Sequence, residues 1–312
     1  MKKLISITGG CYNEEGNIEE LYNRCKAVLA KHPQYDYEFV LADNCSTDGT
    51  RDVIRRIAAQ DPNFKAIFNA RNYGHIRSPF NATLNARGDA VVTMCTDLQE
   101  PPEVIEEFIS KWEEGYKVVV GVRSVSNNGI ILEVFRNLYY WLLGKFAPGE
   151  KLIPRFTGFG LYDRQFIDAL RKYNEPYPYF RGLVSEIGLP RAEVTYIQEK
   201  RKQGKTKNNW FTLYDMAMTG FVNHTKLPLR LATFSGFIIA FLSFIVALFY
   251  FSYKLCHWSS FELGLAPLVI GMFMLSGIQL IFLGVIGEYL GAVWTQVKNR
   301  PLVIEEERIN MS

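Results

Sequence analysis

Two long apolar stretches mark the last third of the chain. Residues 231–253 and 263–287 contain no charged side chain, and only residues 254–262 separate them. About 20 helical residues cross a hydrocarbon core of ~30 Å, and a helix satisfies its own backbone hydrogen bonds there. The pattern therefore predicts a transmembrane helical hairpin. Two buried helices of a soluble domain are the alternative, but such helices rarely run so long without a charge.

The first part of the chain alternates between two other patterns. Short apolar runs bounded by turn residues predict strands at residues 4–8, 37–42, 65–68, 90–95 and 117–122. Apolar residues at helical spacing predict helices within residues 18–29, 53–57 and 104–112. Strands that alternate with helices form parallel βαβ units, so we expect an α/β domain whose sheet is covered on both faces.

Charged side chains follow three of these strands. Asp43, Asp97 and Arg123 come directly after apolar runs, and ligands of such sheets bind outside the carboxyl ends of the strands. We therefore expect the chemistry at these three positions. Ser46 and Asp48 also follow a strand, but they could simply cap the next helix.

The residue types suggest phosphate and metal chemistry. Asp97 and Gln99 can present oxygens to Mg²⁺ or Mn²⁺, which completes its coordination shell with substrate phosphate. A nucleoside-diphosphate leaving group needs such a cation. Cations that suit phosphate come from separate segments, although each could be a solvated surface charge: Arg123, Arg136, Arg201, Lys205 and Lys207.

Composition and flanking charge give a location. The formal net charge is only +3 and no Lys/Arg block dominates, which argues against a nucleic-acid partner. Positive residues flank both outer ends of the apolar pair, so we expect a multi-pass protein of the inner or plasma membrane, with both ends cytoplasmic. The start of the chain leads straight into a strand, so we expect no signal peptide. The cysteines have no CxxC spacing, which is typical of a reducing compartment.

The predicted organisation has three parts. Residues 1–225 form a cytoplasmic domain, 226–290 the hairpin and 291–312 a cytoplasmic tail. Within the first part, residues 130–146 and 210–222 are amphipathic and rich in aromatic side chains. They are either surface helices packed on the core or helices in the membrane interface.

Several motifs recur in an order that is known from one enzyme family. They are Tyr12-Asn13-Glu14-Glu15, Asp43 to Thr50, Asn72-Tyr73-Gly74, Asp97-Leu98-Gln99-Glu100-Pro101-Pro102-Glu103, Gly121-Val122-Arg123, Phe180-Arg181-Gly182-Leu183 and Pro228-Leu229-Arg230 before the apolar pair. In this order the chain resembles glycosyltransferase family 2. The specific resemblance is to the membrane-bound polyisoprenyl-phosphate glycosyltransferases, which include bactoprenol glucosyltransferases and dolichol-phosphate mannose synthases.

The resemblance implies a GT-A (Rossmann-like) nucleotide-binding domain that inverts the anomeric carbon. The donor would be a nucleotide-sugar, with UDP favoured by family habit, and the acceptor a polyprenyl phosphate such as undecaprenyl phosphate. Homo-oligomers, often tetramers, also occur in the family. Carried onto this chain, Asp43 would hold the nucleobase with Tyr12 and Glu14 beside it. Asp97 and Gln99 would sit at the metal and diphosphate.

The same resemblance assigns the acceptor phosphate to Arg123, to Arg136 and to the basic loop that contains Arg201, Lys205 and Lys207. The chain departs from the family pattern at the metal motif, where Cys95 replaces an Asp, and at Gly158, where an Asp would stand. Two rival functions remain open. One is glycan extension on a sugar hydroxyl, which needs a base such as Asp163 or Glu186. The other is a non-catalytic scaffold that binds nucleotide-sugars.

Overall fold

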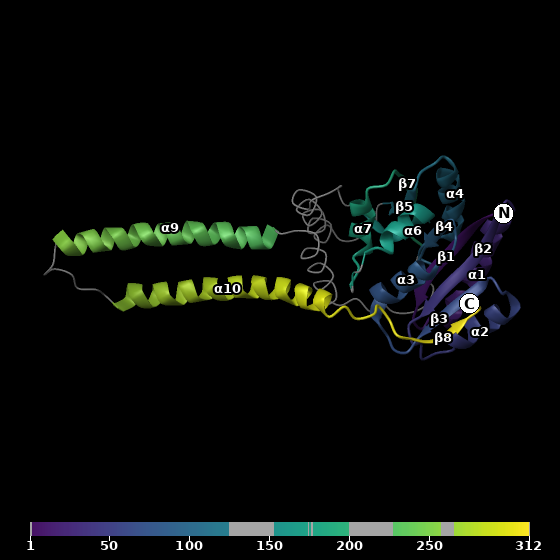
Figure 1. Ribbon diagram of the computed structural model, residues 1–312, viewed down its shortest axis with the longest axis horizontal. Helices are drawn as coiled ribbons and strands as arrows, with labels where there is room; N and C mark the ends of the chain where they lie inside the picture. The colour runs from purple at the N-terminus through teal and green to yellow at the C-terminus, as the bar shows by residue number, and fades with distance from the viewer. Residues whose placement is uncertain are drawn as a thin grey trace. The chain divides into compact units, whose positions relative to one another are not determined.

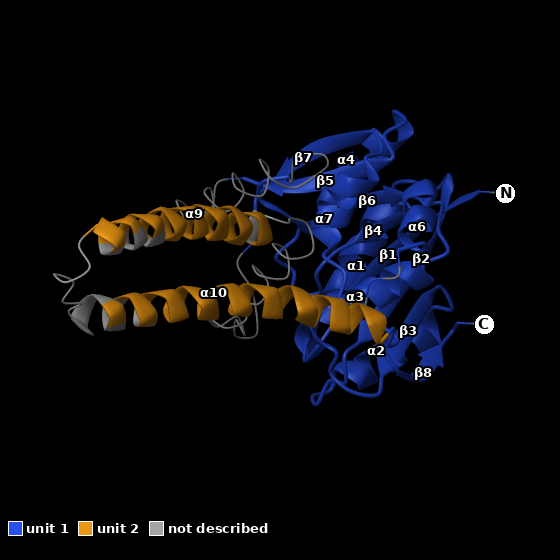
Figure 2. Ribbon diagram, turned by 60° about the vertical axis from the view of Figure 1, so that its left-hand side comes forward, with its two compact units in different colours: residues 1–145, 149–220, 299–312 blue, residues 146–148, 221–298 orange. Residues whose placement is uncertain are grey.

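The computed structural model describes residues 2–124, 153–173, 175, 177–199, 227–256 and 265–311. The chain divides into two compact units (Figure 2): residues 1–145, 149–220 and 299–312 form unit 1, and residues 146–148 and 221–298 form unit 2. The two predicted amphipathic segments and the cations Arg136, Arg201, Lys205 and Lys207 lie outside the described residues.

Unit 1 is built on a mixed sheet with the strand order β7-β5-β6-β4-β1-β2-β3-β8 (Figure 1). The strands are β1 Lys3–Cys11, β2 Tyr35–Asp43, β3 Phe64–Asn69, β4 Ala90–Thr93, β5 Val118–Arg123, β6 Phe156–Asp163, β7 Arg191–Tyr196 and β8 Glu305–Ile309. The first five confirm the predicted strands. β6 and β8 run antiparallel to their neighbours, and the other pairs are parallel. The carboxyl ends of β1 to β5 and β7 therefore share one edge of the sheet.

Helices cover both faces of this sheet, as the alternating pattern predicts. They are α1 Glu15–Ala30, α2 Thr50–Gln60, α3 Gly74–Asn85, α4 Ile105–Glu113, α6 Arg164–Leu170 and α7 Phe180–Ile187, with a short 3-10 turn, η1, at Pro102–Val104. Successive strand residues point to opposite faces. In β5, for example, Val119 joins the core beneath α1, α2 and α4, whereas Val118 and Val120 join the core beneath α6 and α7.

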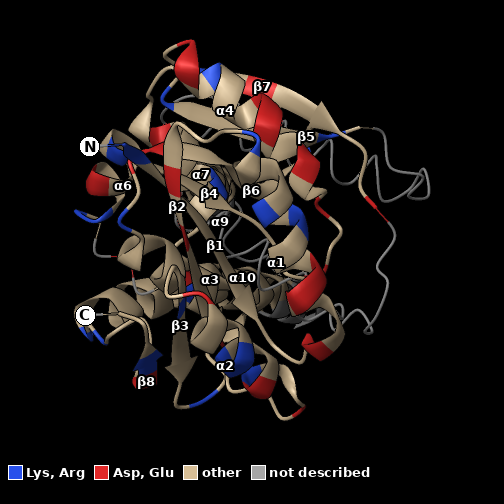
Figure 3. Cartoon of the chain, turned by 90° about the vertical axis from the view of Figure 1, so that its right-hand side faces the viewer, with Lys and Arg blue, Asp and Glu red and all other residues tan. Residues whose placement is uncertain are grey.

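Charged side chains of both signs are interspersed over α1, α2 and α4 (Figure 3). Some of them link neighbouring helices: Lys31 lies 2.8 Å from Glu106, and Arg56 lies 2.7 Å from Glu19. Such exposed pairs contribute only about 0–1 kcal/mol each. The buried apolar side chains between helices and sheet therefore provide most of the stability of this unit.

The described residues of unit 2 form two long helices, α9 Leu227–Cys256 and α10 Leu265–Val297. The stretches Leu229–Val246 and Met274–Val297 are long and apolar enough to cross a membrane. Large apolar side chains such as Phe237 and Leu283 are more than half exposed. These helices match the predicted hairpin, but α10 continues to Val297, past residue 290, where the predicted hairpin ended.

After α10 the chain returns to unit 1. Residues 299–311 include β8, which pairs antiparallel with β3. Asn310 fastens the end of this segment by donating hydrogen bonds to the carbonyl oxygens of Ala58 and Phe64, at 2.8 and 2.9 Å. The sequence predicted the tail but not that it would complete the sheet.

Candidate active site

Two loops lie side by side at the carboxyl ends of β1 and β2. The strands are in register there, with Cys11 opposite Asp43. Asn13 N–H donates to Ser46 Oγ at 2.9 Å, and Thr47 N–H donates to Asn13 Oδ1 at 2.8 Å. Asn13 adopts a φ of 58°, which asparagine tolerates better than most residues. The backbone segment that carries Tyr12 and Glu14 is therefore held against the loop that follows Asp43.

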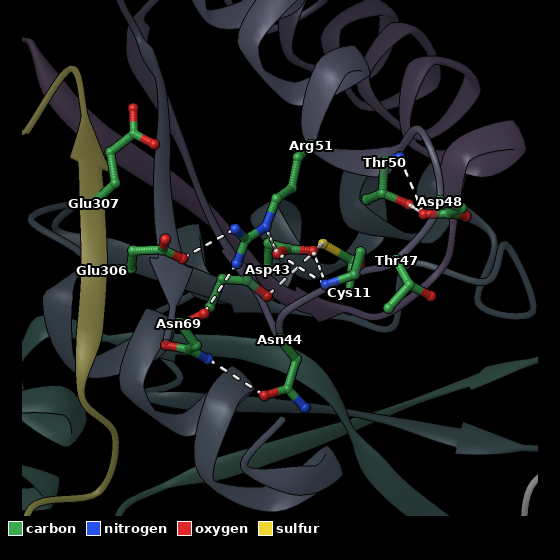
Figure 4. A network of polar contacts seen from close by, with 12 residues as sticks. Cys11, Asp43, Asn44, Thr47, Asp48, Thr50, Arg51, Asn69, Glu306 and Glu307 are labelled. Atoms are coloured by element: carbon green, nitrogen blue, oxygen red, sulfur yellow. Dashed lines mark hydrogen bonds and ion pairs between the residues drawn. The ribbon is translucent and has the colours of Figure 1, made fainter. Parts of the chain in front are cut away.

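Asp43 is completely buried at this edge (Figure 4). Arg51 Nε donates to its Oδ2 at 2.7 Å, and Ser46 N–H lies 3.3 and 3.2 Å from the two carboxylate oxygens. Burying a carboxylate is costly unless it is paired and hydrogen-bonded. The neighbouring groups meet that requirement and fix the orientation of the carboxylate. The sequence predicted Asp43 at the edge but gave no sign of its partner Arg51.

Asp97 lies in a tight loop after β4. Gln99 N–H donates to Asp97 Oδ1 at 3.2 Å, and Thr96 Oγ1 donates to the carbonyl oxygen of Gly10 at 3.1 Å, which ties the loop to the end of β1. Between them Leu98 is fully buried with a φ of 58°. A bulky residue in the left-handed region is an outlier that persists only where the surroundings enforce it, often at functional sites.

Glu100 is the side chain at this edge that sequence reasoning missed. It is buried, accepts a hydrogen bond from Cys95 N–H at 2.7 Å and another from Thr157 Oγ1 at 2.9 Å. The pKa of Glu100 is raised, mainly because the carboxyl group is buried, although the two hydrogen bonds act to lower it. The positive charge of Arg123 also lowers this pKa, and the negative charge of Asp97 raises it. Asp97 and Arg123 therefore both act electrostatically on this carboxyl group. The signal was its place inside the Asp97-to-Glu103 motif.

Arg123 ends β5 on the same edge. Its neighbour Ser124 donates N–H to the carbonyl oxygen of Tyr196 at 2.8 Å, which joins the ends of β5 and β7. Nε of Arg123 is buried and has no hydrogen-bond partner within the described part of the chain. A guanidinium group with a spare N–H suits an anion, and its planar set of donors matches the oxygens of a phosphate or a carboxylate.

Asp163, one of the two candidate bases, lies at the other edge. It ends the antiparallel strand β6 opposite Ala90, the first residue of β4. Trp112 Nε1 donates to Asp163 Oδ2 at 2.8 Å, and Lys117 lies 3.2 Å from the same oxygen. Asp163 Oδ1 also accepts from Gln165 N–H and caps α6. Its role is therefore structural. The other candidate, Glu186, is exposed on α7.

Gly158, where the resemblance predicts an aspartate, has a backbone conformation that favours glycine. Its φ is +112°, a conformation that side chains rarely adopt. Its carbonyl oxygen accepts a hydrogen bond from Tyr162 Oη at 3.0 Å and another from Thr93 Oγ1. The backbone conformation therefore favours glycine here, and a side chain at this position would be strained.

The residues fit a metal ion that the substrate helps to bind. Within the described residues there is no group of three or more His, Cys, Asp or Glu side chains that could hold a metal. The carboxylate of Asp97 and the amide of Gln99 remain as oxygen donors, and Mg²⁺ is often bound through one or two carboxylates plus substrate phosphates. Cys95, with its soft sulfur, is a poor ligand for such a hard cation.

Comparison with known proteins establishes the family. The family model for glycosyl transferase family 2 matches residues 9–171, a segment that contains Tyr12, Glu14, Asp43, Asp97 and Arg123. The chain belongs to glycosyltransferase family 2. This family 2 glycosyltransferase is also similar to other proteins over nearly its whole length. It is 34 % identical over 304 residues to an uncharacterized glycosyltransferase of Bacillus subtilis, covering 97 % of this chain and 93 % of that protein.

Other relatives carry a more specific name. The chain is 30 % identical over 301 residues to a prophage-derived bactoprenol glucosyl transferase of Shigella flexneri, with 96 % of each protein covered. A solved structure, the glucosyl-3-phosphoglycerate synthase of Mycobacterium tuberculosis in complex with phosphoglyceric acid, has a TM-score of 0.51 and 19 % identity. The matched region covers 70 % of this chain and 78 % of the synthase chain. This likeness confirms the predicted GT-A type of fold.

The structure brings the described site residues to one edge and leaves their roles as predictions. Tyr12, Glu14 and Asp43 lie on the β1–β2 side of this edge. Asp97, Gln99 and Arg123 lie on the β4–β5 side.

Proposed function

We propose that this family 2 glycosyltransferase moves one sugar, with inversion, from a nucleotide-sugar to a polyprenyl phosphate. The observation that supports this most is that Asp97 and Arg123 follow β4 and β5, whose carboxyl ends share one edge of the sheet. This puts a candidate ligand for the donor diphosphate on the same edge as a cation for the acceptor. The whole-length similarity to bactoprenol glucosyl transferases favours a lipid phosphate as that acceptor.

The donor would occupy the β1–β2 side. In this proposal Asp43 recognises the nucleobase, with Tyr12 and Glu14 beside it. Asp97 and Gln99 would hold Mg²⁺ or Mn²⁺, which supplies charge neutralisation at the leaving diphosphate when bound. The buried loop around Leu98 keeps Asp97 in place before the donor arrives, so little reorganisation is needed during the reaction.

The acceptor phosphate would bind at Arg123, together with Arg136, Arg201, Lys205 and Lys207. A phosphate monoester has a second pKa of about 6 and is mostly dianionic at neutral pH. It can attack the anomeric carbon without a general base, whereas a sugar hydroxyl needs one. Asp163 cannot be that base because it lies at the opposite edge of the sheet, in contact with Trp112. This favours the phosphate acceptor over the sugar-hydroxyl rival.

The membrane part completes the proposal. We place α9 and α10 across the inner or plasma membrane, with unit 1 in the cytoplasm, so that the lipid acceptor and the soluble donor reach the same protein. Undecaprenyl phosphate is the acceptor we would test first. The expected homo-oligomer stays a prediction.

A donor screen tests the proposal. The purified full-length protein is incubated with undecaprenyl phosphate, Mg²⁺ or Mn²⁺ and each of several UDP-, GDP- and CDP-sugars, and the lipids are analysed by mass spectrometry. We expect one donor to add the mass of one sugar and leave the phosphate attached. Failure of every donor would exclude the proposal. Nucleotide binding without any product would support the non-catalytic scaffold instead.

A further inference from the structure

The C-terminal strand reaches the donor side of the site through a single arginine. Arg51, at the start of α2, lies between the buried Asp43 and the exposed Glu306 of β8 (Figure 4). Its Nε donates to Asp43 Oδ2 at 2.7 Å and its Nη1 to Glu306 Oε2 at 3.0 Å. The remaining nitrogen, Nη2, donates to the carbonyl oxygen of Asn69 at 2.9 Å. All three nitrogens of the guanidinium group are therefore engaged, and its plane is fixed.

The pairing of β8 with β3 is irregular at Glu306, the residue that contacts Arg51. Glu307 pairs with Phe68 and Glu305 pairs with Asn69, so Glu306 is an extra residue on β8. This arrangement is a β-bulge, which re-aims a side chain and is frequent next to active sites. Glu306 points to Arg51, whereas its neighbour Glu307 pairs with Arg55 at 2.6 Å.

The segment is anchored on both sides of the bulge. Ala70 N–H donates to the carbonyl oxygen of Ile304 at 3.0 Å, and Asn81 Nδ2 donates to Glu305 Oε1 at 2.9 Å. Beyond the bulge, Asn310 is held by the carbonyl oxygens at the end of α2 and the start of β3. A strand fixed at these points can hold a side chain in place, which a loose tail cannot.

We propose that Arg51 and Glu306 are positioning residues that orient the carboxylate of Asp43 toward the donor nucleobase. The C-terminal strand is thus part of the donor site. This inference rests on the proposed function, in which Asp43 recognises the base. Asp43 is fully buried, so a base can contact its carboxylate only after the groups that cover it move aside. Arg51 holds Oδ2 and therefore decides which carboxylate oxygen is left for the base. Substitutions at Arg51 or Glu306 should therefore change the affinity for different nucleobases more than they change the rate of sugar transfer.

The test compares Glu306→Gln and Arg51→Lys with Glu307→Gln in the full-length protein. Glu307→Gln removes the same charge from the next residue of the same strand and does not touch Arg51, so it is the matched control. Binding of UDP, CDP, ADP and GDP is measured by calorimetry, at a temperature where circular dichroism shows every variant folded. The affinity ratio between the preferred diphosphate and the others is the deciding quantity, because a purely structural role would not change it.

We expect Arg51→Lys to raise the Kd of the preferred diphosphate about tenfold, equivalent to ~1.4 kcal/mol, and Glu306→Gln to raise it about threefold. Both should reduce the preference among bases, while Glu307→Gln leaves it unchanged. Wild-type affinity and wild-type preference in both test variants would overturn this inference alone. If the wild type binds none of the four diphosphates, the proposed function falls and this inference falls with it.

Discussion

Asp97 and Arg123 act on the same buried carboxyl group, that of Glu100, and shift its pKa in opposite directions. They come from loops after β4 and β5, two strands that β6 separates in the sheet. The carboxyl ends of these two strands lie at the same edge of the sheet, so an acidic and a basic side chain share that edge. The proposed transfer depends on this arrangement.

Replacing Asp97 should remove activity without unfolding the protein. In Asp97→Asn we expect turnover to fall about 10²–10³-fold, the usual loss when one electrostatic contact to the reacting group is removed. The control is Asp163→Asn, which removes a carboxylate from the opposite edge. It should lower thermal stability because it weakens the contacts to Trp112 and Lys117, but turnover per folded enzyme should stay near wild type. Equal turnover in Asp97→Asn and wild type would remove Asp97 from the mechanism.

Replacing Arg123 should affect the acceptor more than the donor. In Arg123→Ala we expect the KM for polyprenyl phosphate to rise about tenfold, the loss of ~1.4 kcal/mol, with little change in the KM for the nucleotide-sugar. Lys111→Ala removes an exposed cation of α4 that pairs with Glu114 and should change neither constant. A rise confined to the donor KM would contradict the acceptor role.

Gly158 should not tolerate the aspartate of the family pattern. Gly158→Asp and Gly158→Ala both force a side chain into φ +112°, which we expect to cost about 1–3 kcal/mol of stability. The measurement is chemical denaturation of both variants, together with turnover per folded molecule. Higher turnover in Gly158→Asp than in Gly158→Ala would show that this position still takes part in catalysis.

Acid should weaken unit 1 through Glu38. Burial by itself would raise the pKa of Glu38, but hydrogen bonds from Lys65, Ser6 and Arg87 N–H outweigh it and hold the pKa below its usual value. A carboxylate with a lowered pKa stabilises the fold above its unfolded pKa of about 4.3, and this contribution is lost as pH falls through the folded value.

This prediction is tested by measuring the denaturant midpoint of unfolding for wild type and Glu38→Gln between pH 7 and pH 3. The variant should be less stable by about 1–3 kcal/mol at neutral pH, and the difference should shrink below the unfolded pKa. Glu106→Gln, at an exposed ion pair, serves as the control. A difference between Glu38→Gln and wild type that stays constant with pH would contradict the assigned pKa shift.

The sequence predicted the central strands well because their signal is local. Each of β1 to β5 contains a buried apolar run, and the charged residues that end β2 and β5, Asp43 and Arg123, are visible in the sequence. β8 was not predicted, because Glu305 to Arg308 looks like a solvated charged segment. Its pairing with β3 joins Ile309 to Ala66 across most of the chain, and charged residues are common on edge strands.

The missing site residues have a similar explanation. Nothing local distinguishes Arg51 from Arg55 on α2, yet one binds the buried Asp43 and the other binds an exposed glutamate. Glu100 likewise looks like any surface carboxylate until β6 brings Thr157 against it. Tertiary contacts decide both cases. No local residue pattern could reveal Arg51, and for Glu100 the only signal was its place inside the Asp97-to-Glu103 motif.

The acceptor itself gives the most direct test. With the active nucleotide-sugar in excess, the full-length protein is offered undecaprenyl phosphate and undecaprenol in separate reactions, each with an oligosaccharide as competitor. The account predicts rapid sugar transfer to the lipid phosphate and none to the alcohol or the oligosaccharide, because only the phosphate is already a nucleophile at neutral pH. Comparable transfer to either hydroxyl acceptor would contradict it.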